Sequence, residues 1–252
     1  MTAPVFVVPE ADLAAASPGG VVRVAGPEGR HAVTVRRLAV GESVALVDGT
    51  GRRAAGVVAE VVDRQTLDVD ITACETEPAP EPRLVVVQAL PKGERGELAV
   101  ELLTEVGVDV IVPWSAANCV TQWRPDRTER AHRRWDDAAL AAAKQARRAR
   151  FPVIEALATT ADVVALLAAA SQALVLHESA TAPIGEVRAV DAGDIVLVIG
   201  PEGGLTPVEL AAFAEAGAAA VRLGPSVLRT SSAGMAAASV VLASSGRWSV
   251  EG

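Results

Sequence analysis

The sequence contains no tyrosine, and aromatic residues make up only 3% of its 252 residues. Half of the residues are nevertheless apolar, so alanine and valine supply much of the core and helices can pack closely on small side chains. This apolar content excludes an intrinsically disordered chain, which would be poor in apolar residues and rich in charge. A chain of this length is expected to form one or two domains.

Cysteine is scarce as well, because the chain has only Cys74 and Cys119, far apart and outside any CxxC motif. They cannot build a disulfide framework or a zinc site, and we expect two unpaired thiols in a reducing cytoplasm and no bound metal. The longest apolar run, Val163–Leu176, is 14 residues long, too short to span a bilayer, and no signal peptide is expected at the N-terminus. The sequence therefore predicts a cytoplasmic protein without a membrane partner.

Basic residues are fewer than acidic ones, 23 against 31, which gives a formal net charge of -8. Taken alone, this charge argues against wholesale binding of nucleic acid. The segment Arg124–Arg150 is the exception, because it holds nine basic and four acidic residues, a local net charge of +5. A charged helix face is usually only solvated, but this excess in an acidic chain favours contact with an RNA backbone.

The chain divides at a segment in which proline and glutamate alternate, residues 75–83, which cannot pack into a core and favours an extended linker. Residues 1–74 show short valine-rich runs broken by Gly, Pro and Asp, with a hairpin-turn signal at Asp48–Gly51. We expect a small β-barrel there. The runs are Val5–Val8, Val21–Val24, Ser43–Val47, Gly56–Val62 and Thr66–Ile71.

Residues 84–252 alternate between strand and helix patterns, which predicts an α/β domain with a mostly parallel sheet. Thr206 and Pro207 read as the N-cap and first residue of one helix. We expect strands at Leu84–Ala89, Val108–Val112, Leu174–His177, Ile195–Ile199 and Ala220–Leu223, and helices at Gly96–Val106, Arg127–Arg148, Pro207–Gly217 and Ser231–Ser245.

Two loops of this domain could carry chemistry. The first, Gly200–Gly204, follows an apolar strand and precedes the capped helix, where an open parallel sheet binds its ligands. Its glycines would let the backbone approach a ligand, although an ordinary tight turn has about equal weight. The loop is neither a P-loop nor GxGxxG.

The second loop, Leu223–Ala233, also joins a strand to a helix. Thr230 or Ser231 could simply cap that helix. Arg229 is harder to explain in this way, because a cation beside a helix start is repelled by the positive end of the helix dipole. Arg229 is therefore expected to meet an anion or a polarised carbonyl.

Together these loops resemble the RsmE family, SPOUT-class methyltransferases that act on small-subunit ribosomal RNA. The resemblance extends over nearly the whole chain. The motifs that carry it are Ile199–Gly204, Leu223–Thr230, His31 with Arg37, Leu46–Gly51, Pro91–Gly93, Thr104–Val108, and Gln145 with Arg148 and Pro152.

The resemblance implies an N-terminal PUA-like barrel and a C-terminal SPOUT domain tied in a trefoil knot. It implies a homodimer that uses S-adenosylmethionine to methylate N3 of one uridine, at position 1498 of 16S rRNA, in the assembled 30S subunit. The implied cofactor residues are Leu176, His177, Gly200, Pro201, Glu202, Gly203, Gly204, Leu223, Gly224, Val227, Leu228 and Ser231.

For catalysis we expect Arg229 to stabilise charge on a uracil carbonyl oxygen and Thr230, or a water, to relay the N3 proton. His177 and the adjacent Glu178 fit a pocket wall better than a base. Ser231 stands where the family has an acid. The residues expected to contact RNA are His31, Arg36, Arg37, Lys92, Arg133, Arg147 and Arg148.

Some alternatives stay open at this point. A SPOUT enzyme could methylate a ribose 2′-hydroxyl instead, or the chain could be a catalytically inactive RNA-binding protein. Trp114, Trp123 and Trp135 could stack on bases, or could belong to the core or a dimer interface.

Overall fold

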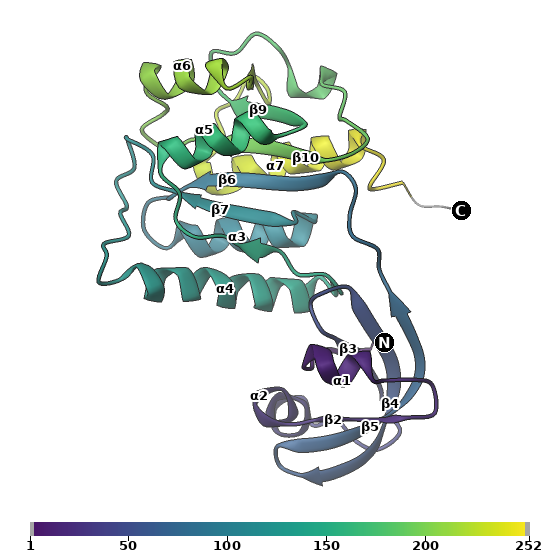
Figure 1. Ribbon diagram of the computed structural model, residues 1–252. Coiled ribbons are helices and arrows are strands. Elements are labelled where there is room, and N and C mark those ends of the chain that lie inside the picture. Colours follow the sequence, from purple (N-terminus) through teal and green to yellow (C-terminus); the bar gives the residue numbers. More distant parts are fainter. Residues whose placement is uncertain (1–2, 250–252) are drawn as a thin grey trace. The chain divides into compact units, whose positions relative to one another are not determined.

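A computed structural model describes residues 3–249 and shows two compact units (Figure 1). The N-terminal unit runs to Ala79 and takes in Ala143–Phe151, and the C-terminal unit comprises Pro80–Ala142 and the chain from Pro152 onward. The expected outer domain limits at residues 1 and 252 lie outside the described residues. Strand β5 continues to Thr76 and β6 starts at Arg83, so both strands reach into the expected linker.

The N-terminal unit is a five-stranded sheet with the order β1-β3-β4-β5-β2, antiparallel except for the pair β1 and β3. Every expected strand is present, because alternating valines bury one face, as the alternately exposed and buried residues of β2 show. Three register shifts bend the long pair β4 and β5. The strands are β1 (Val5–Val7), β2 (Val21–Val24), β3 (Ser43–Val47), β4 (Arg52–Asp63) and β5 (Thr66–Thr76).

Three short helical elements of this unit were not expected, because segments of five residues are too short to show helical periodicity. They are α1 (Glu10–Ala14), α2 (Gly26–Arg30) and a π-helix, η1 (His31–Val35).

The turn at Asp48–Gly51 does more than join β3 to β4. The Asp48 carboxylate accepts hydrogen bonds from the backbone N–H groups of Thr50 and Arg52. Gly51 donates to the carbonyl of Ala149 at 3.0 Å, and a Cβ at Gly51 would collide with the guanidinium of Arg150. The glycine therefore lets a segment from far along the sequence join the N-terminal unit.

The C-terminal unit is an all-parallel sheet of six strands with the order β11-β9-β10-β6-β7-β8. At its centre, Val198 of β10 pairs with Val87 of β6 and Val175 of β9. Nearly all residues of β6 and β7 are buried, so helices must cover both faces, and the expected α/β class is confirmed. The strands are β6 (Arg83–Ala89), β7 (Val110–Trp114), β8 (Val153–Ile154), β9 (Gln172–Leu176), β10 (Asp194–Ile199) and β11 (Ala219–Val221).

Four helices of this unit pack in pairs, α3 with α7 and α5 with α6, whereas α4 belongs to neither pair. Small residues bring α7 close to its neighbours, because Gly234 lies against Leu103 of α3, Gln88 of β6 and Ile199 of β10. The expected helices are all present, and Thr206 caps α6 as predicted. The elements are α3 (Arg95–Val106), α4 (Thr128–Gln145), α5 (Thr160–Ala169), a 3-10 turn, η2 (Ile184–Glu186), α6 (Pro207–Glu215) and α7 (Thr230–Ser244).

Helix α5 and strand β8 were not expected. The signal for α5 is a capping box in which the Thr159 side chain accepts from Asp162 N and the Asp162 carboxylate accepts from Thr159 N. None of the helices within residues 3–249 has both the length and the apolar character needed to cross a bilayer.

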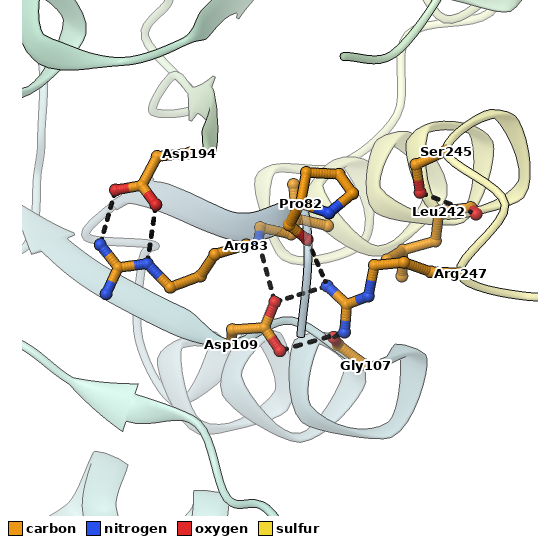
Figure 2. A network of polar contacts seen from close by, with 9 residues as sticks. Pro82, Arg83, Gly107, Asp109, Asp194, Leu242, Ser245 and Arg247 are labelled. Atoms are coloured by element: carbon orange, nitrogen blue, oxygen red, sulfur yellow. Dashed lines mark hydrogen bonds and ion pairs between the residues drawn. The ribbon is translucent and has the colours of Figure 1, made fainter. Parts of the chain in front are cut away.

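A half-buried ion pair ties the end of the chain to the sheet (Figure 2). The Arg247 guanidinium donates twice to the Asp109 carboxylate, at 2.5 and 3.1 Å, and also to the carbonyls of Pro82 and Gly107. Asp109 accepts a further bond from the backbone N–H of Leu84 at 2.8 Å. This network fixes the starts of β6 and β7 relative to the segment after α7.

Candidate functional site

A cavity of about 620 Å³ opens at the edge of the sheet where β9, β10 and β11 end. The two loops singled out in the sequence form most of its wall, since the carboxyl ends of parallel strands meet at one edge. The expected cofactor and catalytic residues that line it are Leu176, His177, Gly200, Pro201, Glu202, Gly203, Gly204, Leu223, Gly224, Val227, Leu228, Arg229 and Thr230. Ser231 is buried in the first turn of α7 and does not line it.

The first loop needs its glycines for different reasons. A Cβ at Gly203 would come within 2.9 Å of the Asn118 Cβ and 3.0 Å of its backbone oxygen. Gly204 has φ of 72°, a left-handed conformation that favours glycine, and open space around it. At Gly203 a substitution would therefore meet a neighbour, and at Gly204 it would strain the backbone.

Two residues that the sequence analysis missed brace this loop. The Asn118 side-chain amide donates to the carbonyls of Gly203 and Gly204, at 3.2 and 3.0 Å. The buried Glu209 carboxylate accepts from Ala117 N at 2.9 Å and from the N–H and hydroxyl of Thr206 at 2.8 Å each. The spacing Thr206-x-x-Glu209 is a capping box that could have been found from the sequence, whereas Asn118 leaves no local signal.

Glu202 extends the bracing to a third segment. Its carboxylate accepts from the backbone N–H of Lys92 at 3.1 Å, while its side chain lines the cavity. Lys92, an expected RNA contact, is exposed beside the first loop. The resemblance to the Pro91–Gly93 motif thus falls on a segment that contacts the cavity wall.

The second loop is held only at its ends. Arg222 exchanges backbone hydrogen bonds with Ala182 and Ile184, and the carbonyl of Arg229 accepts the first bonds of α7. Within residues 3–249, no hydrogen bond holds the backbone of residues 223–228. Val227 is 83% exposed and Leu228 42% exposed at the mouth of the cavity.

Arg229 is itself the N-cap of α7, so neither Thr230 nor Ser231 caps this helix. Both hydroxyl residues are buried inside the first helical turn because the helix starts one residue earlier than expected. Arg229 is exposed, and no acidic partner for it lies in the described part of the chain. The carbonyl of Thr230 accepts from the side chain of the fully buried Gln88 at 3.4 Å.

His177, which also lines the cavity, has a defined hydrogen-bonding pattern. Its Nδ1 accepts from the backbone N–H of Ser179 at 3.2 Å, so in the neutral ring the proton resides on Nε2. Within the described residues no other group binds this ring, which leaves Nε2–H as a donor at the cavity wall.

The basic segment Arg124–Arg150 is only partly available to RNA. Lys144 pairs with Glu28 at 2.6 Å, Arg134 pairs with Glu97 at 2.7 Å, and Arg150 donates to the carbonyl of Glu77. Those cations hold the fold together. Of the expected RNA contacts, Arg133 and Arg147 are exposed and Arg148 is half-buried.

The remaining expected RNA contacts gather on the N-terminal unit. His31, Arg36 and Arg37 are all exposed in and directly after the π-helix η1. Arg37 has φ of 56°, an unusual conformation for a residue with a side chain. Short π-helical turns often mark functional segments.

The tryptophans divide between the core and a second cavity. Trp114 is fully buried, packs edge-on against Phe213, and belongs to the core. Trp123 and Trp135 line a smaller cavity of about 320 Å³ next to α4. No group of three or more His, Cys, Asp or Glu residues positioned to hold a metal ion occurs between residues 3 and 249.

Comparisons with known proteins agree with this architecture. Residues 78–242 match the family described as an RNA methyltransferase domain, and residues 24–72 match an RNA methyltransferase PUA domain. A Mycobacterium bovis protein named ribosomal RNA small subunit methyltransferase E is 47% identical over 91% of this chain and 89% of its own.

Solved structures are similar as well. Ribosomal RNA small subunit methyltransferase E from Neisseria gonorrhoeae, bound to S-adenosyl methionine, has a TM-score of 0.83 and 25% identity, covering 96% of this chain and 98% of that chain. A probable rRNA-methyltransferase from Porphyromonas gingivalis has a TM-score of 0.79 and 27% identity, covering 97% and 99%. The SPOUT-class fold and the PUA-like unit expected from the sequence motifs are thus confirmed, and the chain belongs to the ribosomal RNA small subunit methyltransferase E family of RNA methyltransferases.

Proposed function

We propose that this protein transfers a methyl group from S-adenosylmethionine to N3 of one uridine in 16S rRNA, at position 1498 by the sequence resemblance, within the 30S subunit. One observation carries the proposal: a glycine-rich loop and an Arg-bearing loop form a single cavity at the carboxyl edge of the parallel sheet. The names of the similar proteins agree with it. Such an enzyme works where ribosomes are, in the cytoplasm.

The cavity fits the proposed cofactor in size and chemistry. Its volume of about 620 Å³ lies within the range of small-molecule sites. Backbone groups of residues 223–228, which bond to no other described group, are available to bind the edge of an adenine ring. The cofactor, when bound, supplies an electrophilic methyl group on a sulfonium.

The residues at the cavity suit the chemistry of uracil. N3 carries a proton and becomes a good nucleophile only when that proton leaves, which places negative charge on the neighbouring carbonyl oxygens. Arg229 stabilises that charge, since it is exposed at the cavity and has no acidic partner among the described residues. Thr230, which lines the same wall, passes the proton to water.

The N-terminal unit contributes RNA binding in this proposal. His31, Arg36 and Arg37 are exposed together in and after η1, and the two arginines supply cations that bind phosphates. The match of residues 24–72 to the PUA domain of RNA methyltransferases covers this turn.

The homodimer, which the sequence resemblance implies, is a further part of the proposal. Gly234 and the other buried small residues of α7 pack inside the same chain and give it no support. Support comes instead from Val227 and Leu228, apolar side chains exposed at the cavity mouth that a second copy would cover. The trefoil knot stays a prediction from the resemblance.

The proposal is tested by incubating the protein with S-adenosylmethionine and either 30S subunits or free 16S rRNA, both lacking the modification. A methyl group on N3 removes the Watson–Crick donor of uridine, so reverse transcriptase should stop at a single position after treatment of the subunits. Methyl transfer without a base-specific stop would indicate a ribose 2′-hydroxyl instead. An absence of both cofactor binding and methyl transfer would indicate an inactive RNA-binding protein.

A further inference from the structure

The smaller cavity next to α4 is separate from the proposed cofactor site. We call it the tryptophan pocket and define it by Gly96, Trp123, Arg127, Arg130, Arg134 and Trp135. Its volume is about 320 Å³, and it shares no lining residue with the cofactor cavity. A space of this size accommodates one nucleotide but no duplex.

Two aromatic rings line the tryptophan pocket, together with the apolar residues Leu90, Pro91 and Ala131. Trp123 is half-buried and meets Trp135 edge-on, with ring centroids 5.2 Å apart and planes at 85°. Trp135 is only 3% exposed. Its ring packs so closely against Gly96 that a Cβ at this position would come within 2.9 Å of the Trp135 Nε1. Trp123 thus remains partly accessible with a rigid support behind it.

One donor that lines the pocket has no protein acceptor. The indole N–H of Trp135 donates to no group in the described part of the chain, and its nitrogen is not among the fully buried polar atoms, so it is accessible from the pocket. Trp114 differs in this respect, because its N–H donates to the hydroxyl of Thr160 at 3.4 Å. The unpaired donor is what a site for a ligand with acceptor oxygens would provide.

Arginines supply the charge of the pocket. Arg127, Arg130 and Arg134 follow each other at helical spacing on one face of α4 or just before it. Arg134 is paired with Glu97 at 2.7 Å, whereas Arg127 has only its exposed neighbour Asp126 at 3.5 Å. Arg130 has no acidic partner among the described residues, so the pocket keeps a net positive charge.

A cleft that shares lining residues with both cavities lies between the tryptophan pocket and the cofactor cavity. Gly93 lines both the pocket and this cleft, which residues 92–95 form with Glu202, and Glu202 lines the cofactor cavity. A nucleic-acid strand could therefore place one nucleotide at each site.

From these observations we infer that the tryptophan pocket binds an unpaired ribonucleotide close along the strand to the methylated base. Trp123 stacks on its base, and Arg127 and Arg130 bind its phosphates, which is how single-stranded RNA is recognised. The inference rests on the proposed function for its choice of RNA as the ligand.

Binding of a fluorescein-labelled uridine hexanucleotide to the full-length protein tests the inference by anisotropy. Loss of one stacked base costs about five- to 150-fold in affinity, so Trp123→Leu should weaken binding by at least about fivefold while Trp123→Phe retains most of it. Arg130→Ala should weaken it by a similar factor. Arg124→Ala, which removes an exposed charge outside the pocket, should change it by less than about twofold.

Equal losses for Arg124→Ala and Arg130→Ala would overturn the inference in favour of general attraction, and so would unchanged binding by Trp123→Leu. If Trp123→Leu does not fold, the comparison of Arg130→Ala with Arg124→Ala, both at exposed positions, still tests the inference. Calorimetric binding of S-adenosylmethionine and methylation by the wild type examine the proposed function separately. A wild type without methyl transfer, combined with the expected losses of hexanucleotide binding, would refute that function and leave the pocket standing.

Discussion

The two loops of the cofactor cavity are built in opposite ways. The first is fastened at several points, by Asn118 to its glycine carbonyls, by Glu209 to its following helix, and by Glu202 to the Lys92 segment. The second is fastened only where it leaves β11 and where it enters α7. The first loop is therefore held in one conformation by hydrogen bonds. The second has backbone groups and apolar side chains without partners in the described part of the chain.

This difference suggests how the work is divided. A pre-organised loop binds a ligand without losing conformational entropy, whereas a loosely held one loses entropy when the ligand or a second copy orders it. We infer that the first loop supplies the larger share of cofactor affinity, while the second adds backbone contacts to the adenine edge and delivers Arg229 once both substrates are bound. The predictions below address this division, starting with the largest expected effect.

Replacing Arg229 by alanine should lower the rate of methyl transfer about 100- to 1000-fold, because losing one donor to a developing oxyanion typically has that effect. Single-turnover methylation at saturating S-adenosylmethionine and saturating 30S subunits measures it. Arg222→Ala is the matched control, since Arg222 lies on the same cavity at the fastened start of the loop. We expect it to stay within about threefold of the wild type.

A methyl-transfer rate for Arg229→Ala within about threefold of the wild-type rate would exclude Arg229 from the chemistry. Cofactor affinity or melting temperature falling in step with the rate would instead indicate that Arg229 only shapes the loop.

The second prediction compares one glycine from each loop. Gly203→Ala forces a methyl group against Asn118, and overpacking of 1–3 kcal/mol corresponds to roughly five- to 150-fold weaker binding of S-adenosylmethionine. Gly224→Ala should be tolerated within about twofold, because a Cβ there meets nothing within 4 Å and the backbone is not left-handed. Calorimetric titration of the full-length proteins provides both values.

If both substitutions weaken the cofactor equally, the second loop contributes as much to binding as the first. The proposed division between the loops would then be wrong.

The sequence predicted the loops but not their fastening. Local patterns are enough to predict strand β10, the glycines that follow it and the cap at Thr206, because each of these depends on neighbouring residues. The amide of Asn118 reaches a loop 85 residues further along, and no local pattern encodes such a contact. The helix start at Arg229 was missed by one residue, since Thr230 and Ser231 are better cap residues by type and were buried instead.

The same limit affected the basic segment Arg124–Arg150. Its charge excess was visible in the sequence, but the pairing of Lys144 with Glu28 joins residues 116 positions apart. Counting charges could not separate cations that hold the fold from those left for RNA. The short segment 149–151 likewise joins the N-terminal unit through Gly49 and Gly51, which the sequence placed only in a turn.

The smallest expected effect uses Cys119, next to Asn118, as a reporter of the fastened loop. Burial raises the pKa of the Cys119 thiol, and the negative charges of Glu202 and Glu209 raise it further, outweighing hydrogen bonds from Ala116 and Leu90. Only the thiolate attacks a disulfide reagent, so Cys119 should react slowly at neutral pH and its rate should increase as the pH rises. The exposed Cys74 should react first.

In a Cys74→Ala background, Asn118→Ala should speed the reaction of Cys119 about fivefold, the equivalent of about 1 kcal/mol for a lost hydrogen bond. Stopped-flow absorbance with a chromogenic disulfide measures the rate, and S-adenosylmethionine should slow it. A Gly224→Ala control should leave the rate unchanged, and an equal acceleration by that control would show that Cys119 reports general loosening of the unit and nothing specific to the first loop.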